Sequence, residues 1–197
     1  MPKTDEAIQR HFHFSGRNRN LPWYPREGKR HKLAQLFGIL GMNEGVEVGT
    51  YRGFWAEYLF QMNPKLHLTC IDPWVTYDGG GRSPERQVLC YEETQSRLKN
   101  FNVTIIKDMS MSVVGQFKDG SLDFVYIDGN HAFNYAIMDI IHWVPKVRTE
   151  GIVAIHDYHH QVGCDVIEAV NAYTRVHHID PWYITREEWP TAFWVRK

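Results

Sequence analysis

Acidic side chains follow short apolar runs of this 197-residue chain at the points where the runs end. These acids are Glu47, Asp72, Asp108, Asp128 and Asp157, the last one directly preceded by His156. Carboxylates accept hydrogen bonds from hydroxyl groups and can ligate cations, and a histidine can move protons near neutral pH. Because ligands of open parallel sheets bind beyond the carboxyl ends of the strands, we expect these side chains to form one site.

The glycine-containing stretch over residues 45–53 reads G-V-E-V-G-T-Y-R-G and is followed by a helix-like segment over residues 54–60. Glycine in such a turn lets the backbone approach a ligand where a Cβ would clash, and the helix N-terminus adds unpaired N–H groups. Glu47 argues against a phosphate ligand, because like charges repel, and suits a cationic or hydroxyl-rich one. The spacing alone is common in α/β proteins and does not identify the ligand.

The spacing of apolar residues predicts alternating strands and helices. We expect helices over residues 29–40, 54–60, 83–99, 137–144 and 165–173, and strands over residues 46–48, 66–72, 103–106, 122–127, 151–155, 182–184 and 192–195. This alternation predicts a Rossmann-like three-layer α/β sandwich with a seven-stranded, mostly parallel sheet and an antiparallel C-terminal strand. Residues 1–28 are expected to form an N-terminal arm and residues 29–197 a single domain.

Composition limits the partners that we expect. The net charge is −1, which favours neither nucleic acid nor a membrane surface, although residues 1–32 carry eight Lys and Arg against three Asp and Glu, a balance of +5. That basic segment is either a solvated arm or a surface for an anionic ligand. The three cysteines form no C-x-x-C pair, and no apolar run reaches membrane-spanning length. We therefore expect a cytoplasmic protein, and aromatic residues near both ends would suit a homo-oligomer.

Together these residues resemble a class I S-adenosylmethionine-dependent methyltransferase over residues 33–173. The stretch with Glu47, Gly49 and Gly53 is similar to the first motif of that family, and Asp72 to the acid that accepts the ribose hydroxyls. The resemblance places the adenine ring at Asp108-Met109-Ser110. It implies cofactor-binding roles for Glu47, Gly49, Thr50, Tyr51, Gly53, Asp72, Trp74, Asp108, Met109, Ser110 and Asp128.

Two further motifs, I-D-G-N-H ending at His131 and A-I-H-D ending at Asp157, resemble a methyltransferase-24-like group near the metal-dependent O-methyltransferases of macrolide sugars, and more distantly catechol-type enzymes. This resemblance implies Asp128, His156 and Asp157 as ligands of a divalent metal. It also implies His131, together with Asp128, as the catalytic group that deprotonates a small hydroxylated acceptor such as a sugar. Because the sugar enzymes tend to have Glu where this chain has His156, the ion could be Mg²⁺, Mn²⁺ or a softer metal.

Several alternatives stay open from the sequence. His131 could cap the following helix, Asp157 could be an Asx-turn residue without a metal, and Trp74 could pack beneath the loop that follows it. The protein could also bind the methyl donor without catalysis, or be an NAD-linked oxidoreductase, although its first loop lacks G-x-G-x-x-G. The acceptor pocket is expected to come from residues 11–31, 73–84 and 157–164.

Overall fold

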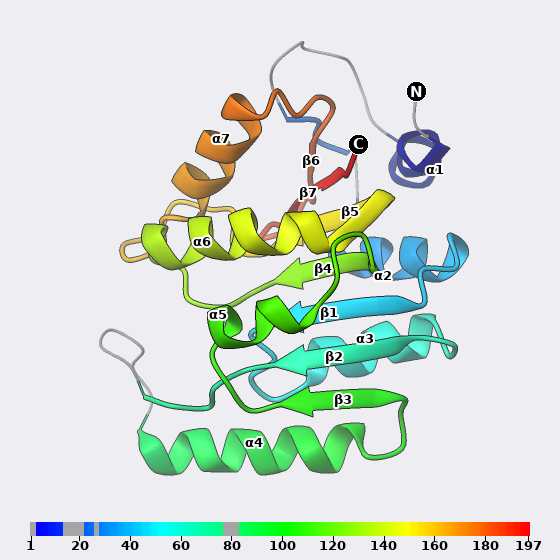
Figure 1. The fold of residues 1–197 in the computed structure, drawn as a ribbon. Coiled ribbons are helices and arrows are strands. Elements are labelled where there is room, and N and C mark those ends of the chain that lie inside the picture. Colours follow the sequence, from blue (N-terminus) through cyan, green and yellow to red (C-terminus); the bar gives the residue numbers. More distant parts are fainter. Residues whose placement is uncertain (1–2, 14–21, 26–27, 77–82) are drawn as a thin grey trace.

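A computed structural model describes residues 3–13, 22–25, 28–76 and 83–197, and its centre is one seven-stranded sheet (Figure 1). The strands lie in the order β3-β2-β1-β4-β5-β7-β6. They are β1 (Glu44–Val48), β2 (His67–Ile71), β3 (Val103–Ile106), β4 (Leu122–Ile127), β5 (Val147–Ile155), β6 (Tyr183–Ile184) and β7 (Ala192–Val195). The first five pair in parallel, and β7 is antiparallel to both β5 and β6. The predicted fold class is confirmed.

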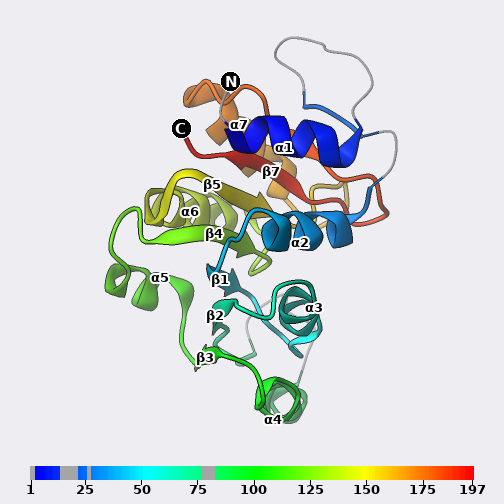
Figure 2. The same cartoon turned by 90° about the vertical axis from the view of Figure 1, so that its right-hand side faces the viewer.

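Helices cover both faces of the sheet (Figure 2). One face carries α1 (Lys3–Phe12), α2 (Arg30–Ile39), α3 (Phe54–Met62) and α4 (Pro84–Leu98), and the other carries α5 (Ser110–Val113), α6 (Phe133–Trp143) and α7 (Val166–Val176). Successive strand side chains point to opposite faces. Phe124 and Tyr126 of β4 therefore join the core under the first group, whereas Val125 and Ile127 join the core under the second.

The N-terminal segment packs onto the body wherever the structure describes it. Ile8 and Phe12 on one side of α1 are fully buried in the core that also contains α2. Thr4 ties the helix to β5, because its amide donates to Glu150 Oε2 and its hydroxyl donates to the Glu150 carbonyl, both at 2.9 Å. Further along, Trp23 forms a parallel bridge with Tyr183. Residues 3–13 and 22–25 thus pack against the layered fold.

The sheet brings the predicted acids to one edge. Strand β1 has β2 on one side and β4 on the other, so the chain reverses its direction of winding between these neighbours. In the register, Val48 lies opposite both Ile71 and Ile127. The residues that follow these three positions, Gly49, Asp72 and Asp128, consequently emerge side by side at the point where an open sheet leaves a crevice. In the described part of the chain, no helix is long and apolar enough to cross a bilayer.

Candidate active site

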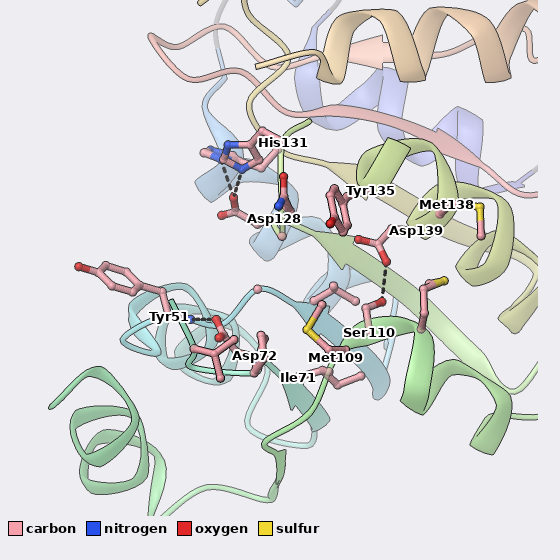
Figure 3. Close-up of a pocket in the computed structure, with 18 of the residues that line it drawn as sticks. Tyr51, Ile71, Asp72, Met109, Ser110, Asp128, His131, Tyr135, Met138 and Asp139 are labelled. Atoms are coloured by element: carbon pink, nitrogen blue, oxygen red, sulfur yellow. Dashed lines mark hydrogen bonds and ion pairs between the residues drawn. The ribbon is translucent and has the colours of Figure 1, made fainter. Parts of the chain in front are cut away.

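A cavity of about 770 Å³ lies beyond the carboxyl ends of β1, β2 and β4 (Figure 3). Its wall includes Gly49, Tyr51 and Asp72 on one side and Asp128, His131, His156 and Asp157 on another. A third part comes from the segment after β3 and from α6, and it contains Met109, Ser110, Met111, Tyr135, Met138 and Asp139. Residues 14–21, 26–27 and 77–82, which fall within the predicted acceptor loops, lie outside the described residues.

The turn after β1 requires glycine at position 49. Gly49 has a φ of 88°, and a Cβ there would lie 2.0 Å from the Asp128 carbonyl oxygen. Its amide donates to the Ile71 carbonyl at 2.8 Å, which holds the turn against β2. Gly53 also has a positive φ, 75°, and forms the N-cap of α3. Gly49 thus lets two backbone segments approach each other beside the cavity, whereas Gly53 acts on the helix start and is not part of the cavity wall.

Asp72 is held by backbone N–H groups from two directions. Its Oδ2 accepts from the Tyr51 amide at 2.9 Å, and its Oδ1 accepts from the Trp74 amide at 2.8 Å. Tyr51 itself has a φ of 53°, which turns its amide toward the carboxylate. A carboxylate oxygen can accept more than one hydrogen bond, so Asp72 keeps acceptor capacity for hydroxyl groups in the cavity.

Glu47 lies behind the cavity rather than in its wall. Its side chain is buried, and among the described residues its Oε2 has no hydrogen-bond partner. Burial raises the pKa of Glu47 to about 8, and the neighbouring Asp128 adds to this rise. At neutral pH the group is therefore mostly a neutral carboxylic acid, whereas the sequence led us to expect a charged carboxylate that faces the ligand. The adjacent Thr50 is likewise buried and not part of the wall.

Two further predicted donor-binding residues, Trp74 and Asp108, are not part of the cavity wall. Trp74 is 3% exposed, packs against Tyr91 with ring centroids 4.8 Å apart, and donates from Nε1 to the Tyr51 carbonyl. It supports the turn after β1, whereas the loop beneath which it could alternatively pack includes residues 77–82, which lie outside the described residues. Asp108 is exposed, and its Oδ1 accepts from the Met109 amide at 2.7 Å. The Asp108 carboxylate is solvated at the surface rather than in the cavity. The next two residues, Met109 and Ser110, form the cavity wall at the end of β3.

The charged cluster, which we define as Asp128, His131, His156 and Asp157, occupies the other end of the cavity. His131 Nε2 lies 3.0 Å from Asp157 Oδ2 and 3.4 Å from Asp128 Oδ1. His156 Nδ1 lies 3.0 Å from Asp157 Oδ1. Burial alone would raise the pKa of Asp128, but the two histidines outweigh it and hold that pKa at about 2. Burial lowers the pKa of His131, and the two carboxylates raise it by more.

The local structure bears on the alternatives left open for His131 and Asp157. Helix α6 is not capped by His131, because Asp165 Oδ2 accepts from the Phe133 amide at 3.1 Å. Asp157 has a φ of 60° and turns its carboxylate toward the two imidazoles. Asp128, His131 and Asp157 each offer one ligand atom, and these atoms lie within 4.8 Å of one another. His156, predicted as a ligand, is not in this set.

Arg30 belongs to the basic segment over residues 1–32, and its residue type alone pointed to no place in this site. It begins α2, and its Nη1 lies 2.9 Å from His156 Nε2, with its guanidinium over the Trp55 ring at 5.2 Å. A guanidinium can only donate, so His156 Nε2 accepts and Nδ1 carries the proton that faces the carboxylates. Burial lowers the pKa of His156 and the carboxylates raise it by more, while this contact opposes protonation of Nε2.

Asp139 is the second residue that the sequence analysis missed. It lies on α6 with 6% of its surface exposed, lines the cavity, and accepts from the Ser110 hydroxyl through Oδ1 at 2.5 Å. Burial raises its pKa to about 6. An acid between Met138 and Ile140 on an apolar helix was a detectable signal, because Asp is almost never buried without a partner.

Comparisons with known proteins agree with this architecture. A family model described as "Methyltransferase domain" matches residues 46–158, which is more than half of the chain. An O-methyltransferase from Bacillus cereus, solved in complex with SAH, is 14% identical with a TM-score of 0.61, over 98% of this chain and 90% of that one. TomG, an O-methyltransferase from Streptomyces achromogenes involved in tomaymycin synthesis and solved with SAM, is 16% identical with a TM-score of 0.58, over 98% and 89%.

A curated relative is a protein named y4gI, described as uncharacterized, from Sinorhizobium fredii (strain NBRC 101917 / NGR234). It is 21% identical over 119 residues, which are 57% of this chain and 13% of that protein. The chain therefore aligns with only a small part of that much longer relative. At these identities the solved structures show a shared fold.

Proposed function

Because this chain belongs to the methyltransferase-domain family, we propose that it transfers a methyl group from S-adenosylmethionine to a hydroxyl of a small acceptor. The observation that carries the proposal is that one cavity contains both a nucleoside-sized pocket and a half-buried histidine between two carboxylates. The nucleoside-sized part of the cavity, which we call the donor half, consists of Gly49, Asp72, Met109 and Ser110. The charged cluster forms the acceptor side.

The donor half suits a nucleoside attached to a charged chain. Asp72 offers acceptors for ribose hydroxyls, and its backbone contacts fix the carboxylate before any ligand arrives. Met109 is 47% exposed and presents an apolar, polarizable side chain that can lie against a ring. Gly49 lets the backbone after β1 lie directly against the Asp128 carbonyl, which brings the ends of β1 and β4 together beside this pocket. The sulfonium would stand near Asp128, whose negative charge suits it.

In the charged cluster, His131 is the proposed general base. An acceptor hydroxyl is a weak nucleophile until its proton leaves, and an imidazole with a pKa near neutrality can take that proton. His131 Nε2 faces Asp157 and Asp128 and carries the hydrogen directed at them, so the acceptor's proton goes to Nδ1, and the two carboxylates stabilise the resulting imidazolium. The donor supplies an electrophilic methyl group, so the new O–C bond forms as the S–C bond breaks and S-adenosylhomocysteine leaves.

The same cluster also fits a divalent cation. Two carboxylate oxygens and one imidazole nitrogen within 4.8 Å form a partial ligand set that suits Mn²⁺, Fe²⁺ or Zn²⁺ better than Mg²⁺. Such a cation would lower the pKa of an acceptor hydroxyl and orient it. Asp128 and Asp157 would hold it, and His131 would then be a ligand instead of the base. Since Arg30 engages His156 Nε2, His156 would orient the carboxylates through Nδ1.

Calorimetric titration with S-adenosylhomocysteine tests the donor half directly. We expect saturable binding, with no comparable binding of NADH. Absence of binding would exclude the methyltransferase proposal, and saturation by NADH would favour an oxidoreductase.

Formation of S-adenosylhomocysteine over a panel of small hydroxylated acceptors tests the transfer. The panel is run with Mn²⁺ and with a chelator, because activity that survives chelation assigns His131 as the base. Donor binding without turnover and without any effect of Asp128→Ala would favour a non-catalytic binder.

A further inference from the structure

Arg30 reaches the charged cluster from the start of α2, and contacts with two other parts of the fold hold it in place. Its backbone amide donates to Glu187 Oε1 at 2.6 Å, and the Thr185 hydroxyl donates to the same oxygen at 2.8 Å. Its guanidinium lies over the ring of Trp55, a buried residue of α3. The connection between β6 and β7 therefore fixes the backbone of Arg30, and α3 supports its side chain.

The contact between Arg30 and His156 decides which ring nitrogen carries hydrogen. Arg30 Nη1 lies 2.9 Å from His156 Nε2, and a guanidinium can only donate, so Nε2 must keep its lone pair. The carboxylates on the other side favour a second hydrogen on the ring, but on Nε2 it would face an N–H of Arg30. With 7% of His156 exposed, solvent offers Nε2 little alternative to this partner. The single hydrogen of the ring is therefore on Nδ1.

Nδ1 of His156 faces the two carboxylates of the charged cluster. It lies 3.0 Å from Asp157 Oδ1 and 3.5 Å from Asp128 Oδ1. A hydrogen on Nδ1 presents positive charge to both oxygens, whereas a bare Nδ1 would direct a lone pair at them, which is unfavourable in a buried site. Asp157 Oδ2 lies 3.0 Å from His131 Nε2, so this carboxylate stands between the two rings.

The orientation of the Asp157 carboxylate depends on the imidazoles around it. In the part of the chain that the structure describes, no backbone amide donates to this carboxylate, whereas two backbone amides hold Asp72. Besides His131 and His156, a third imidazole lies near it, with His159 Nε2 3.7 Å from Oδ1. A change in the hydrogen of His156 should therefore alter how Asp157 faces His131.

We infer that Arg30 is a positioning residue, which keeps the hydrogen of His156 on Nδ1 and thereby sets the Asp157 carboxylate against His131. Its consequence for catalysis rests on the proposed function, in which His131 receives the proton of the acceptor. Arg30 acts through His156 and Asp157 and contacts neither the donor half nor the acceptor hydroxyl. The start of α2 and the connection between β6 and β7 thus contribute to the site although neither forms its wall.

Heteronuclear NMR of the imidazole rings tests the placement of the hydrogen without any substrate. In the unmodified protein, the ring signals of His156, assigned by comparison with His156→Gln, should show hydrogen on Nδ1 and a bare Nε2. Arg30→Met removes the donor and keeps an unbranched side chain, so hydrogen should appear on Nε2. Arg30→Lys keeps a donor and the positive charge and should retain the pattern of the unmodified protein.

Steady-state rates separate a positioning role from a merely structural one. Arg30→Met should lower the turnover rate roughly 10- to 100-fold, the range for residues that orient a reacting group through a neighbour, while the acceptor KM and the affinity for S-adenosylhomocysteine stay within about threefold. Arg30→Lys should recover most of the rate. Lys29→Met is the matched control, because it removes the same charge from the adjacent exposed residue, whose side chain has no hydrogen bond or ion pair in the described part of the chain. It should change neither the rate nor the spectrum.

The spectrum of the unmodified protein decides the inference by itself, and thermal unfolding checks that each variant is folded. Hydrogen on Nε2 of His156 in the unmodified protein, or an unchanged pattern in Arg30→Met, overturns the inference and leaves the proposed function in place. A changed pattern in Arg30→Met with an unchanged turnover rate also overturns it. Absence of binding to S-adenosylhomocysteine overturns the proposed function, and the spectrum then still decides where the hydrogen lies.

Discussion

The two ends of the cavity are built in different ways. The donor half depends on backbone conformation, because Gly49 and Tyr51 both have positive φ angles and Asp72 is held by two backbone amides. The charged cluster depends on side chains from different strand ends that balance one another's charge. A backbone-built site is fixed before its ligand arrives, whereas a side-chain cluster can change its protonation or admit a cation. This difference fits a constant donor and an acceptor side that carries out the proton transfer.

The largest effect should come from Gly49→Ala, which disturbs the backbone conformation on which the donor half depends. A Cβ there would meet the Asp128 carbonyl at 2.0 Å, and neither backbone segment can move without disturbing β1 or β4. We expect a loss of more than about 3 kcal/mol in the free energy of unfolding, with loss of donor binding. Gly163→Ala is the control, since Gly163 has a φ of 81° with no atom within 4 Å of its Cβ position. Its cost should be about 1 kcal/mol, from strain alone. Equal costs in denaturant unfolding would show that no close approach exists.

The next effect should come from His131→Gln, which removes an imidazole from the charged cluster and leaves the donor half unchanged. Loss of a general base should lower the turnover rate by roughly 10²- to 10⁴-fold while the affinity for S-adenosylhomocysteine stays within about threefold. His160→Gln, at an exposed position of the loop after β5, should leave both quantities unchanged. Steady-state rates and calorimetry measure the two quantities separately. A parallel loss of donor affinity would mean that the two ends are not separable.

A smaller effect is expected from Asp72→Asn. The amide group can accept from only one of the two backbone amides and would turn an N–H toward the other. Donor affinity should fall roughly tenfold. Asp123→Asn is a matched control at the opposite edge of the sheet, where Asp123 Oδ2 also accepts from two backbone amides, those of Asn43 and Glu44, at 2.6 and 2.9 Å. It should lower stability without changing donor affinity in the same calorimetric assay.

The smallest effect concerns Glu47 and the pH dependence of stability. Its pKa is about 8 in the folded protein, above the ordinary value of 4.5, so the folded state holds this proton more tightly than the unfolded state. Its stabilising contribution is complete below about pH 4.5 and is lost progressively as the pH rises toward 8. Glu47→Gln should therefore gain stability relative to the unmodified protein as the pH rises over this range. Chemical denaturation at several pH values measures the slope, and parallel curves would contradict the raised pKa.

Much of the fold and part of the site could be predicted from the sequence. The alternation of apolar runs gave the order of β2 to β5 and of the helices between them, because that periodicity is local. Ser83 and Pro84 predicted the start of α4, and Ser83 Oγ does accept from the Arg86 amide. Strand β5 is longer than predicted, since it begins at Val147 and continues past Glu150, which has a φ of 66°. Helix α1 lies in the segment that was expected to form an N-terminal arm, and its burial depends on contacts far along the chain.

The sequence by itself determined that Gly49, Asp72, Asp128 and Asp157 share one edge, because parallel strands in register carry the residues after their carboxyl ends to the same place. Only the tertiary structure decided which side chains complete the cavity. Asp139 enters from the packed face of α6, Arg30 reaches His156 from the start of α2, and Trp74 turns away to pack against Tyr91. These pairings depend on how each helix is rotated and docked against the sheet, and local periodicity does not specify that geometry.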